Sequence, residues 1–396
     1  MKKQFNVNQS LSKKIIEAIR ISLNFPKKKV YLHEPRFIGN ESSYLKECID
    51  TTFVSSIGEF VNRFEKNLKN YTGSKFVVAV VNGTAALHIA MKLVGVCRGD
   101  EVLLPALNFI ASANAVSYCN AIPHFVDSEE KTLGIDSKKL EKYLDKITEQ
   151  KNGLCINRKT LRIIRACVPT HIFGHPIDLN GLIKVTNKFN IELIEDAAES
   201  LGSFYNKTHT GTFGKIGILS FNGNKILTTG GGGAILTNDK IIADRAKHLT
   251  TTAKKNHEWE LFYEEVGYNY RMPNINAALG CAQLEKIPEL LKIKRKLFKS
   301  YKKSLNQLSL NNDVKILQEP KGCSSNYWLQ TLLLTKSSMD QRNDILYKTN
   351  QAGFNTRPAY SLNHKLSHFK NYPKMDLTVA ESLEGKIINL PSNETI

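Results

Sequence analysis

The chain has 396 residues, of which 41% are hydrophobic and 23% charged, ordinary values for a globular protein that exclude an intrinsically disordered chain. No run of about 18 apolar residues occurs and the lysine-containing N-terminus lacks a secretory apolar segment, so we expect a soluble, cytoplasmic protein without membrane contact. Lysine and arginine exceed aspartate and glutamate by 55 to 37, and this net charge of +18 favours anionic small molecules; no basic stripe interleaved with aromatic residues suggests nucleic acid.

The N-terminal part of the chain predicts helices. Residues 10–24 carry isoleucine and leucine at helical spacing, and Pro26 with three lysines ends that segment. Residues 41–54 and 58–72 predict two further helices, with glycines between and after them.

From residue 76 onward, strand-like and helix-like segments alternate. The valine-rich run 76–81 indicates a strand buried on both faces. The alternation continues with helices at 84–94, 109–118, 137–148 and 179–190, and strands at 101–104, 122–126, 163–168, 191–195 and 216–221. Residues 150–161 are expected to form a surface loop. This order predicts an α/β fold with a mainly parallel sheet covered by helices.

The pattern changes after about residue 270. The expected elements there are a helical stretch at 274–309, strands at 313–316 and 327–334, and a helix at 339–350. We therefore expect three regions: an N-terminal helical extension over 1–30, a large domain over 31–270 and a small C-terminal α/β domain over 271–396.

Three segments carry residue types suited to chemistry. Asn82-Gly83-Thr84-Ala85 lies where a buried strand meets a helix, so its free N–H groups and hydroxyl could bind a phosphate, although an ordinary helix cap has the same pattern. Asp196 ends a predicted parallel strand, where open α/β sheets place ligands, but it could equally cap a helix.

The third segment contains Lys225, between a strand-like run and four consecutive glycines. A lysine held inside a fold can act as a nucleophilic amine, whereas a solvated turn lysine would do nothing. A phosphate anchor, a strand-end aspartate and a lysine, in that order, are the groups that pyridoxal 5′-phosphate requires: donors for its phosphate, a carboxylate for its ring nitrogen and an amine for its aldehyde.

With these segments, the sequence resembles the DegT-type, pyridoxal-phosphate-dependent sugar-nucleotide aminotransferases from about Tyr31 to its end. The motifs that carry the resemblance are NGTAALH at 82–88, PALNFIASANA at 105–115, EDAAESLGS at 195–203, SFNGNK at 220–225 and GYNYRMPNINAALG at 267–280. The resemblance implies the fold type I of pyridoxal-phosphate-dependent transferases, as in aspartate aminotransferase. It also implies a homodimer with active sites at the subunit interface.

The resemblance assigns roles to the residues of the three segments. Lys225 would form the covalent link to the cofactor and later move a proton. Asp196 would pair with the pyridine nitrogen. Thr84 and Ala85, together with Ser220, would hold the phosphate.

Four further positions follow from the same motifs. Phe109 would stack on the cofactor ring, the alternative being core packing. Glu199 stands where relatives often have His or Gln near the ring hydroxyl. Asn269 would reach the phosphate bound by the neighbouring subunit. Arg271 would bind an anionic substrate group or an interface carboxylate.

Residues 31–61, and the four glycines after SFNGNK, resemble the legionaminic-acid and bacillosamine branch of the family. That branch implies L-glutamate as amino donor and a UDP-linked 4-keto-6-deoxy-N-acetylhexosamine as acceptor, as in a UDP-4-amino-4,6-dideoxy-N-acetylglucosamine transaminase. A perosamine-type enzyme acting on GDP-4-keto-6-deoxymannose is the nearest alternative. A non-catalytic regulatory or binding protein on the same fold is the alternative of another class.

We expect no metal site. The seven cysteines show no CxxC spacing, which predicts free thiols rather than a zinc site or a disulfide framework. His171 and His175 are four residues apart, but Gly174 and Pro176 prevent a helix that would bring them to one face.

Overall fold

The computed structural model describes residues 10–255, 257, 259–336 and 338–393. Within these ranges no helix combines the length and hydrophobicity needed to cross a bilayer. All seven cysteines are free thiols, as predicted.

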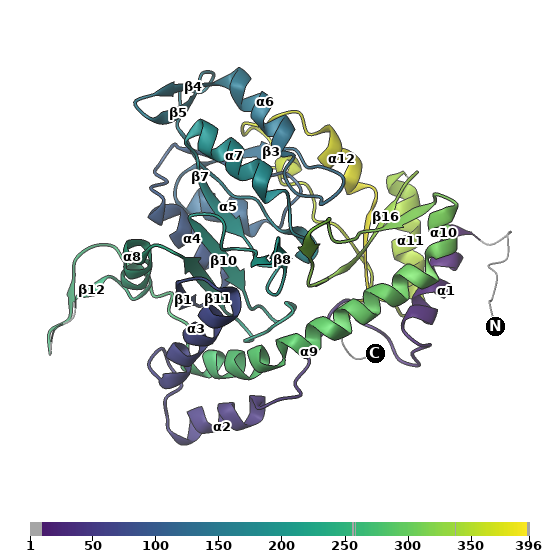
Figure 1. Cartoon of the computed structure of the whole chain (residues 1–396), viewed down its shortest axis with the longest axis horizontal. Helices are drawn as coiled ribbons and strands as arrows, with labels where there is room; N and C mark the ends of the chain where they lie inside the picture. Colours follow the sequence, from purple (N-terminus) through teal and green to yellow (C-terminus); the bar gives the residue numbers. More distant parts are fainter. Residues whose placement is uncertain (1–9, 256, 258, 337, 394–396) are drawn as a thin grey trace.

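A seven-stranded sheet forms the centre of the molecule (Figure 1). Its strands, in spatial order, are β1 (Phe76–Val80), β11 (Gly233–Thr237), β10 (Ile216–Ser220), β7 (Glu192–Asp196), β6 (Ile164–Cys167), β2 (Glu101–Pro105) and β3 (Ile122–Val126). Only β11 runs against the others: it pairs antiparallel with both β1 and β10, and the remaining pairs are parallel. The predicted mainly parallel sheet is confirmed.

Six helices in the described part of the chain surround this sheet. They are α3 (Glu59–Thr72), α4 (Gly83–Leu93), α5 (Ala111–Tyr118), α6 (Ser137–Ile147), α7 (Leu179–Phe189) and α8 (Lys240–Thr250). In α3, Phe60, Phe64 and Leu68 recur every four residues and are all buried, which fixes the face that the helix turns inward. The helix ends at Gly73, whose φ of 75° is a left-handed conformation that glycine adopts without strain.

The segment expected to be a surface loop is instead a hairpin, so that prediction was wrong. Strands β4 (Thr148–Lys151) and β5 (Leu154–Asn157) pair antiparallel. Asn152 and Gly153 between them have φ values of 52° and 74°, the left-handed pair that a tight hairpin turn requires.

The C-terminal unit is built on an antiparallel sheet with the order β14 (Val314–Ile316), β16 (Gln330–Leu334), β18 (Ile387–Leu390) and β17 (Arg357–Pro358). Helix α1 (Leu11–Ser22) and helix α11 (Met339–Gln351) lie on this unit. Ile15 and Ile19 of α1 belong to the same hydrophobic cluster as Leu332, so α1 packs into the C-terminal core.

The long helix α9 (Asn274–Ser304) runs from one unit to the other (Figure 1). Cys281 and Ile287 in its first half belong to the core under the large sheet, whereas Leu297 and Tyr301 near its end belong to the second core. The remaining helices are α2 (Glu41–Asp50), α10 (Asn306–Leu310) and α12 (Thr378–Glu384), with the 3₁₀ turns η1 (Ile172–Gly174) and η2 (Asn363–Lys365). A small three-stranded sheet has the order β15 (Cys323–Ser324), β8 (Phe204–Tyr205) and β9 (Thr208–His209), and β12 (Lys254–Lys255) pairs with β13 (Phe262–Tyr263). The two boundaries between the three expected regions stay predictions.

Candidate active site

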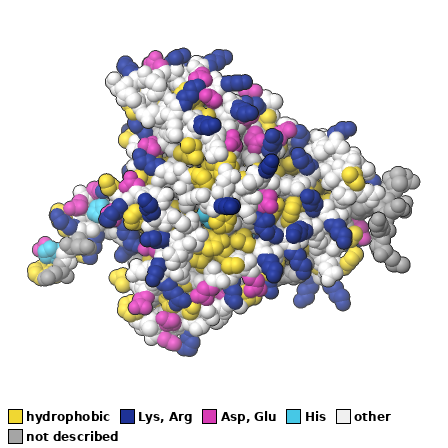
Figure 2. All heavy atoms as spheres, in the orientation of Figure 1, with side chains coloured by type: hydrophobic (Ala, Val, Ile, Leu, Met, Phe, Trp, Pro, Cys, Tyr) yellow, Lys and Arg dark blue, Asp and Glu magenta, His cyan; other side chains and the backbone are white. Residues whose placement is uncertain are grey.

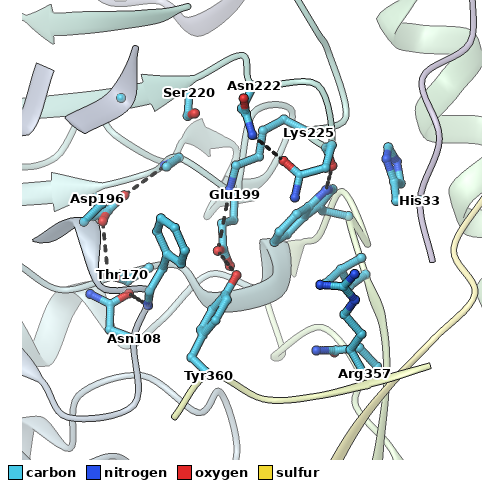
Figure 3. A pocket seen from close by; sticks show the side chains of 18 of the residues that line it. His33, Asn108, Thr170, Asp196, Glu199, Ser220, Asn222, Lys225, Arg357 and Tyr360 are labelled. Carbon is cyan, nitrogen blue, oxygen red and sulfur yellow. Dashed lines mark hydrogen bonds and ion pairs between the residues drawn. The ribbon is translucent and has the colours of Figure 1, made fainter. Parts of the chain in front are cut away.

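A pocket of about 600 Å³ lies at the carboxyl ends of two parallel strands, where Asp196 ends β7 and Ser220 ends β10 (Figure 3). The start of α4 forms its third side, and residues of the C-terminal unit close it. The predicted site residues that line it are Thr84, Phe109, Asp196, Glu199, Ser220 and Lys225.

The N-terminus of α4 fits a phosphate group. Helix N–H groups without intrahelical partners and the helix dipole attract anions. Thr84 and Ser220 line the pocket beside this helix start, whereas Ala85 lies behind it and its N–H donates to the Asn82 side chain, 2.8 Å away. A Cβ atom at Gly83 would come within 2.9 Å of the Ser220 Cβ, so glycine is needed for the helix to begin this close to β10.

Asp196 is a buried carboxylate that suits a cationic partner. Its Oδ2 accepts a 2.8 Å hydrogen bond from Ser112, and its Oδ1 accepts a 3.2 Å bond from the Ala198 N–H. Burial raises the pKa of Asp196 despite these bonds, because the charged form loses its hydration. A protonated ring nitrogen placed against it would restore the charged form. Ser112 was missed in the sequence analysis, since a serine at the second position of a helix carries no distinctive signal.

Lys225 lies inside the pocket and is not a solvated turn lysine. Its side chain is 13% exposed, and its Nζ atom lies 4.1 Å from the centroid of the Trp328 ring and 3.6 Å from Glu199 Oε1. The Trp328 indole N–H donates to the Asn224 carbonyl, 2.6 Å away, and so ties the C-terminal unit to the segment that carries the lysine.

Glu199 is held from two sides. Its Oε1 accepts from the Tyr360 hydroxyl at 2.7 Å, and its Oε2 accepts from the Phe173 N–H at 2.7 Å. Burial raises the pKa of Glu199, and the nearby Lys225 opposes that rise. Phe109 is 51% exposed beside Tyr360, with 5.5 Å between the ring centroids, which excludes the core-packing alternative for this phenylalanine.

Besides Ala85, two predicted residues lie outside the pocket. Asn269 is exposed and forms an isolated bridge with Thr251, whereas Arg271 bridges Val80 at the end of β1. Conversely, two residues that were not predicted, His33 and Arg357, line the pocket. They lie on the far side of Lys225 from Asp196 (Figure 3). Sequence reasoning missed both. They are more than 300 residues apart in the chain and belong to none of the motifs that predicted the site.

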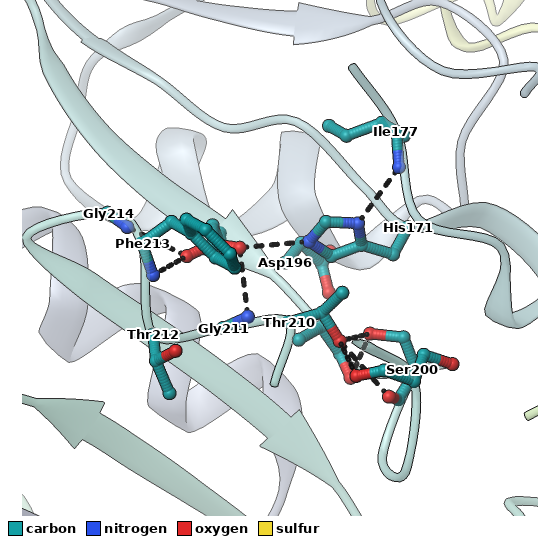
Figure 4. Close-up of polar contacts among 12 residues, drawn as sticks. His171, Ile177, Asp196, Ser200, Thr210, Gly211, Thr212, Phe213 and Gly214 are labelled. Atoms are coloured by element: carbon teal, nitrogen blue, oxygen red, sulfur yellow. Dashed lines mark hydrogen bonds and ion pairs between the residues drawn. The ribbon is translucent and has the colours of Figure 1, made fainter. Parts of the chain in front are cut away.

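Beside the pocket, a buried network positions β7 (Figure 4). Glu195 accepts hydrogen bonds from the backbone N–H groups of Gly211, Phe213 and Gly214 at 2.6–2.8 Å, and it contacts His171 Nε2 at 3.0 Å. Burial alone would raise the pKa of Glu195, but these bonds outweigh it and lower the pKa. His171 is therefore engaged in this network, and no group of His, Cys, Asp and Glu in the described ranges could hold a metal ion.

Comparison with known proteins agrees with this geometry. The DegT/DnrJ/EryC1/StrS aminotransferase family matches residues 36–396. The GDP-perosamine synthase of Escherichia coli O157:H7 is 36% identical to this chain, and the alignment covers 92% of this chain and 93% of the synthase. A UDP-4-amino-4,6-dideoxy-N-acetyl-beta-L-altrosamine transaminase of Campylobacter jejuni is 29% identical over 79% of each chain.

A solved structure shares the fold. Helicobacter pylori PseC, an aminotransferase involved in the biosynthesis of pseudoaminic acid, superposes with a TM-score of 0.84 at 22% identity, covering 93% of this chain and 95% of its own. This likeness and the mainly parallel sheet confirm the predicted fold type I. Pyridoxal 5′-phosphate is the cofactor. The pocket presents the hydroxyls of Thr84 and Ser220, the carboxylate of Asp196 and the amine of Lys225, whose chemistry suits its phosphate, ring nitrogen and aldehyde. The chain belongs to the DegT/DnrJ/EryC1/StrS aminotransferase family.

Proposed function

We propose that the protein transfers the amino group of L-glutamate to C4 of a nucleotide-linked 4-keto-6-deoxyhexose. The observation that carries this proposal is Lys225 inside a pocket that also presents Asp196 and the start of α4. Bound there, pyridoxal phosphate supplies an aldehyde that carries the amino group and a ring that withdraws electrons.

Four residues of the pocket and the start of α4 have parts in this reaction. Thr84, Ser220 and the first turn of α4 hold the phosphate and so fix the ring in the pocket. Asp196 keeps the ring nitrogen protonated. The Lys225 amine would hold the cofactor between turnovers. Once released, it would take the proton from the α-carbon of glutamate and deliver it to the former aldehyde carbon of the cofactor. The same residues act in reverse on the ketosugar.

Two nucleotide sugars are candidates for the acceptor. The branch resemblance favours a UDP-linked 4-keto-6-deoxy-N-acetylhexosamine, which would give a UDP-4-amino-4,6-dideoxy-N-acetylhexosamine for a bacterial surface glycan. The similarity to GDP-perosamine synthases over more than nine-tenths of the chain favours GDP-4-keto-6-deoxymannose. Both carry a diphosphate, to which a protein of net charge +18 and the Arg357 side chain at the pocket are suited. Lysine and arginine are spread over the viewed face rather than gathered in one stripe (Figure 2).

A substrate panel tests the proposal. The loaded protein is incubated with L-glutamate and, separately, with the UDP-linked and the GDP-linked 4-ketosugar, and NMR identifies the product and its configuration at C4. We expect an amino sugar from one of the two and 2-oxoglutarate in equal amount. The Lys225→Ala variant is the control. Absence of amino sugar with both acceptors would refute the proposal.

We also propose that two copies of the chain complete each site. Asn269 is exposed and outside its own pocket, as expected of a residue that serves a partner. Large apolar side chains are exposed around α2 and on the β12–β13 arm, a surface typical of a protein interface; they are Ile49, Phe53, Val54, Ile57, Trp259, Leu261, Phe262 and Tyr263.

Sedimentation and subunit mixing test the assembly. We expect a dimer in solution. Lys225→Ala and Asn269→Ala chains, each impaired alone, should regain part of the activity when unfolded and refolded together, because mixed dimers contain one site with both residues intact. A monomer, or no recovery on mixing, would contradict the shared site.

A further inference from the structure

Tyr360 links the C-terminal unit to the carboxylate beside Lys225. It follows β17, and its hydroxyl donates to Glu199 Oε1 over 2.7 Å. The centroid of its ring lies 5.5 Å from that of Phe109 and 5.9 Å from that of Phe173. Figure 3 shows the hydroxyl turned toward Glu199 from the side opposite Asn222. The phenol is therefore fixed by two rings and one hydrogen bond.

The second donor to Glu199 depends on an unusual backbone conformation. Phe173 has a φ of 55°, the left-handed region that residues other than glycine seldom adopt. In this conformation its N–H points to Glu199 Oε2, 2.7 Å away. A strained residue in contact with a functional group indicates that the orientation of that group matters.

Lys225 is the third neighbour of the carboxylate but is not within hydrogen-bonding distance. Its Nζ atom is 3.6 Å from Oε1, beyond the 2.7–3.2 Å typical of an N–H···O bond. Two neutral donors thus hold both oxygens of Glu199, and the lysine nitrogen faces this carboxylate from 3.6 Å.

The charged and titratable groups around Glu199 come from three places in the chain: Asp196 at the end of β7, Lys225 after β10 and Tyr360 after β17. Burial and Asp196 favour the protonated form of Glu199, whereas Lys225, Tyr360 and the Phe173 N–H favour the charged form. Burial and Glu199 raise the pKa of Tyr360 well above its usual value, so its hydroxyl stays neutral and donates.

We propose that Tyr360 is a positioning residue: its hydroxyl keeps Glu199 ionised and aimed at the Lys225 nitrogen, so that the C-terminal unit sets the charge next to the reacting amine. The inference rests on the proposed function only in taking Lys225 as the residue that holds the cofactor.

A double-mutant cycle tests it. Tyr360→Phe, Glu199→Gln and the double variant are loaded with pyridoxal phosphate, and visible absorbance is recorded against pH. Glu199→Gln removes the negative charge beside the cofactor and should move the pH midpoint of the visible absorbance to lower pH. Tyr360→Phe removes one hydrogen bond from the ionised Glu199, which should raise the proton-binding constant of that carboxylate about 3- to 10-fold. The absorbance midpoint should therefore move in the same direction as in Glu199→Gln, but less far. The double variant should match Glu199→Gln.

Two further proteins complete the design. Tyr372→Phe removes a phenol hydroxyl of the C-terminal unit outside the pocket and should leave the titration unchanged. Replacing Tyr360 by 3-fluorotyrosine keeps its shape but makes it a stronger donor, and should shift the titration opposite to Tyr360→Phe even if that variant folds poorly.

The inference is overturned if Tyr360→Phe and the fluorotyrosine protein both titrate like the wild type. It is also overturned if Tyr360→Phe shifts the titration by the same amount in the Glu199→Gln background as in the wild-type background. Failure of the proposed function would look different, because the wild-type protein itself would then show no visible absorbance after loading.

Discussion

Replacing Asp196 by asparagine should weaken cofactor binding without weakening the fold. The ring nitrogen would lose a hydrogen bond to a charged group, which contributes about 1.5–3 kcal/mol. Since about 1.4 kcal/mol corresponds to a tenfold change in affinity, the expected loss is about 10- to 150-fold. The Ser112 hydroxyl can turn and accept from the new amide, so the contacts within the protein survive.

In the apoprotein, the same substitution should stabilise the fold rather than weaken it. Burial raises the pKa of Asp196 above its ordinary value of 3.8, so the folded state binds the proton more tightly than the unfolded state. The resulting stabilisation is present below pH 3.8 and is lost as the pH rises through the native pKa. At neutral pH the ionised Asp196 therefore opposes folding of the apoprotein, and apo Asp196→Asn should melt at or above the wild-type temperature.

Absorbance titration with pyridoxal phosphate and thermal unfolding of the apoprotein measure the two effects. Glu192→Gln is the matched control: it makes the same change on the same strand, but its carboxylate pairs with Lys215 at the surface and should alter neither quantity. Wild-type cofactor affinity in Asp196→Asn, or an apoprotein that melts several degrees lower, would refute the reasoning.

Three other substitutions should have effects of predictable sign. Lys225→Ala should give a colourless, inactive protein, measured by absorbance and turnover; a yellow, active variant would show that another amine holds the cofactor. Glu195→Gln should cost about 3 kcal/mol in urea unfolding at pH 7, because at least one buried N–H loses its acceptor. Because the pKa of Glu195 is lower in the folded than in the unfolded protein, the loss of stability in Glu195→Gln should reach its full size above pH 4.5. It should disappear as the pH falls through the pKa of Glu195 in the folded protein. A loss of stability that does not depend on pH would contradict the view that Glu195 is ionised and accepts these bonds. Gly233→Ala should reduce both cofactor retention and melting temperature, because its Cβ would lie 2.6 Å from the Asn82 backbone, whereas Gly231→Ala, with its nearest neighbour at 3.8 Å, should be mild. Equal behaviour of the two glycine variants would count against a close approach at Gly233.

Local sequence patterns were sufficient to predict the parallel strands of the large sheet, because each is a short apolar run between turn residues. Strand β11 was not predicted, since it begins within the four glycines, which by themselves indicate a turn. The hairpin at β4 and β5 was missed although Asn152-Gly153 is a known hairpin signal, because the flanking residues are mostly polar.

For the site, the sequence motifs predicted the residues that the large sheet contributes. Thr84, Asp196, Ser220 and Lys225 all follow or precede strands of one sheet, so topology predicts their convergence. Tyr360 and Trp328 contact Glu199 and Lys225 from the C-terminal unit. Their positions depend on how two units pack against each other, which no spacing along a single sequence expresses.

The helix α9 has a mechanical consequence. The two ends of α9 are embedded in different cores. Unfolding of either core would therefore remove packing contacts from a helix on which the other core also depends. The protein should therefore melt in a single step, and two fragments severed in the middle of α9 should each lack part of the interior that they need to fold.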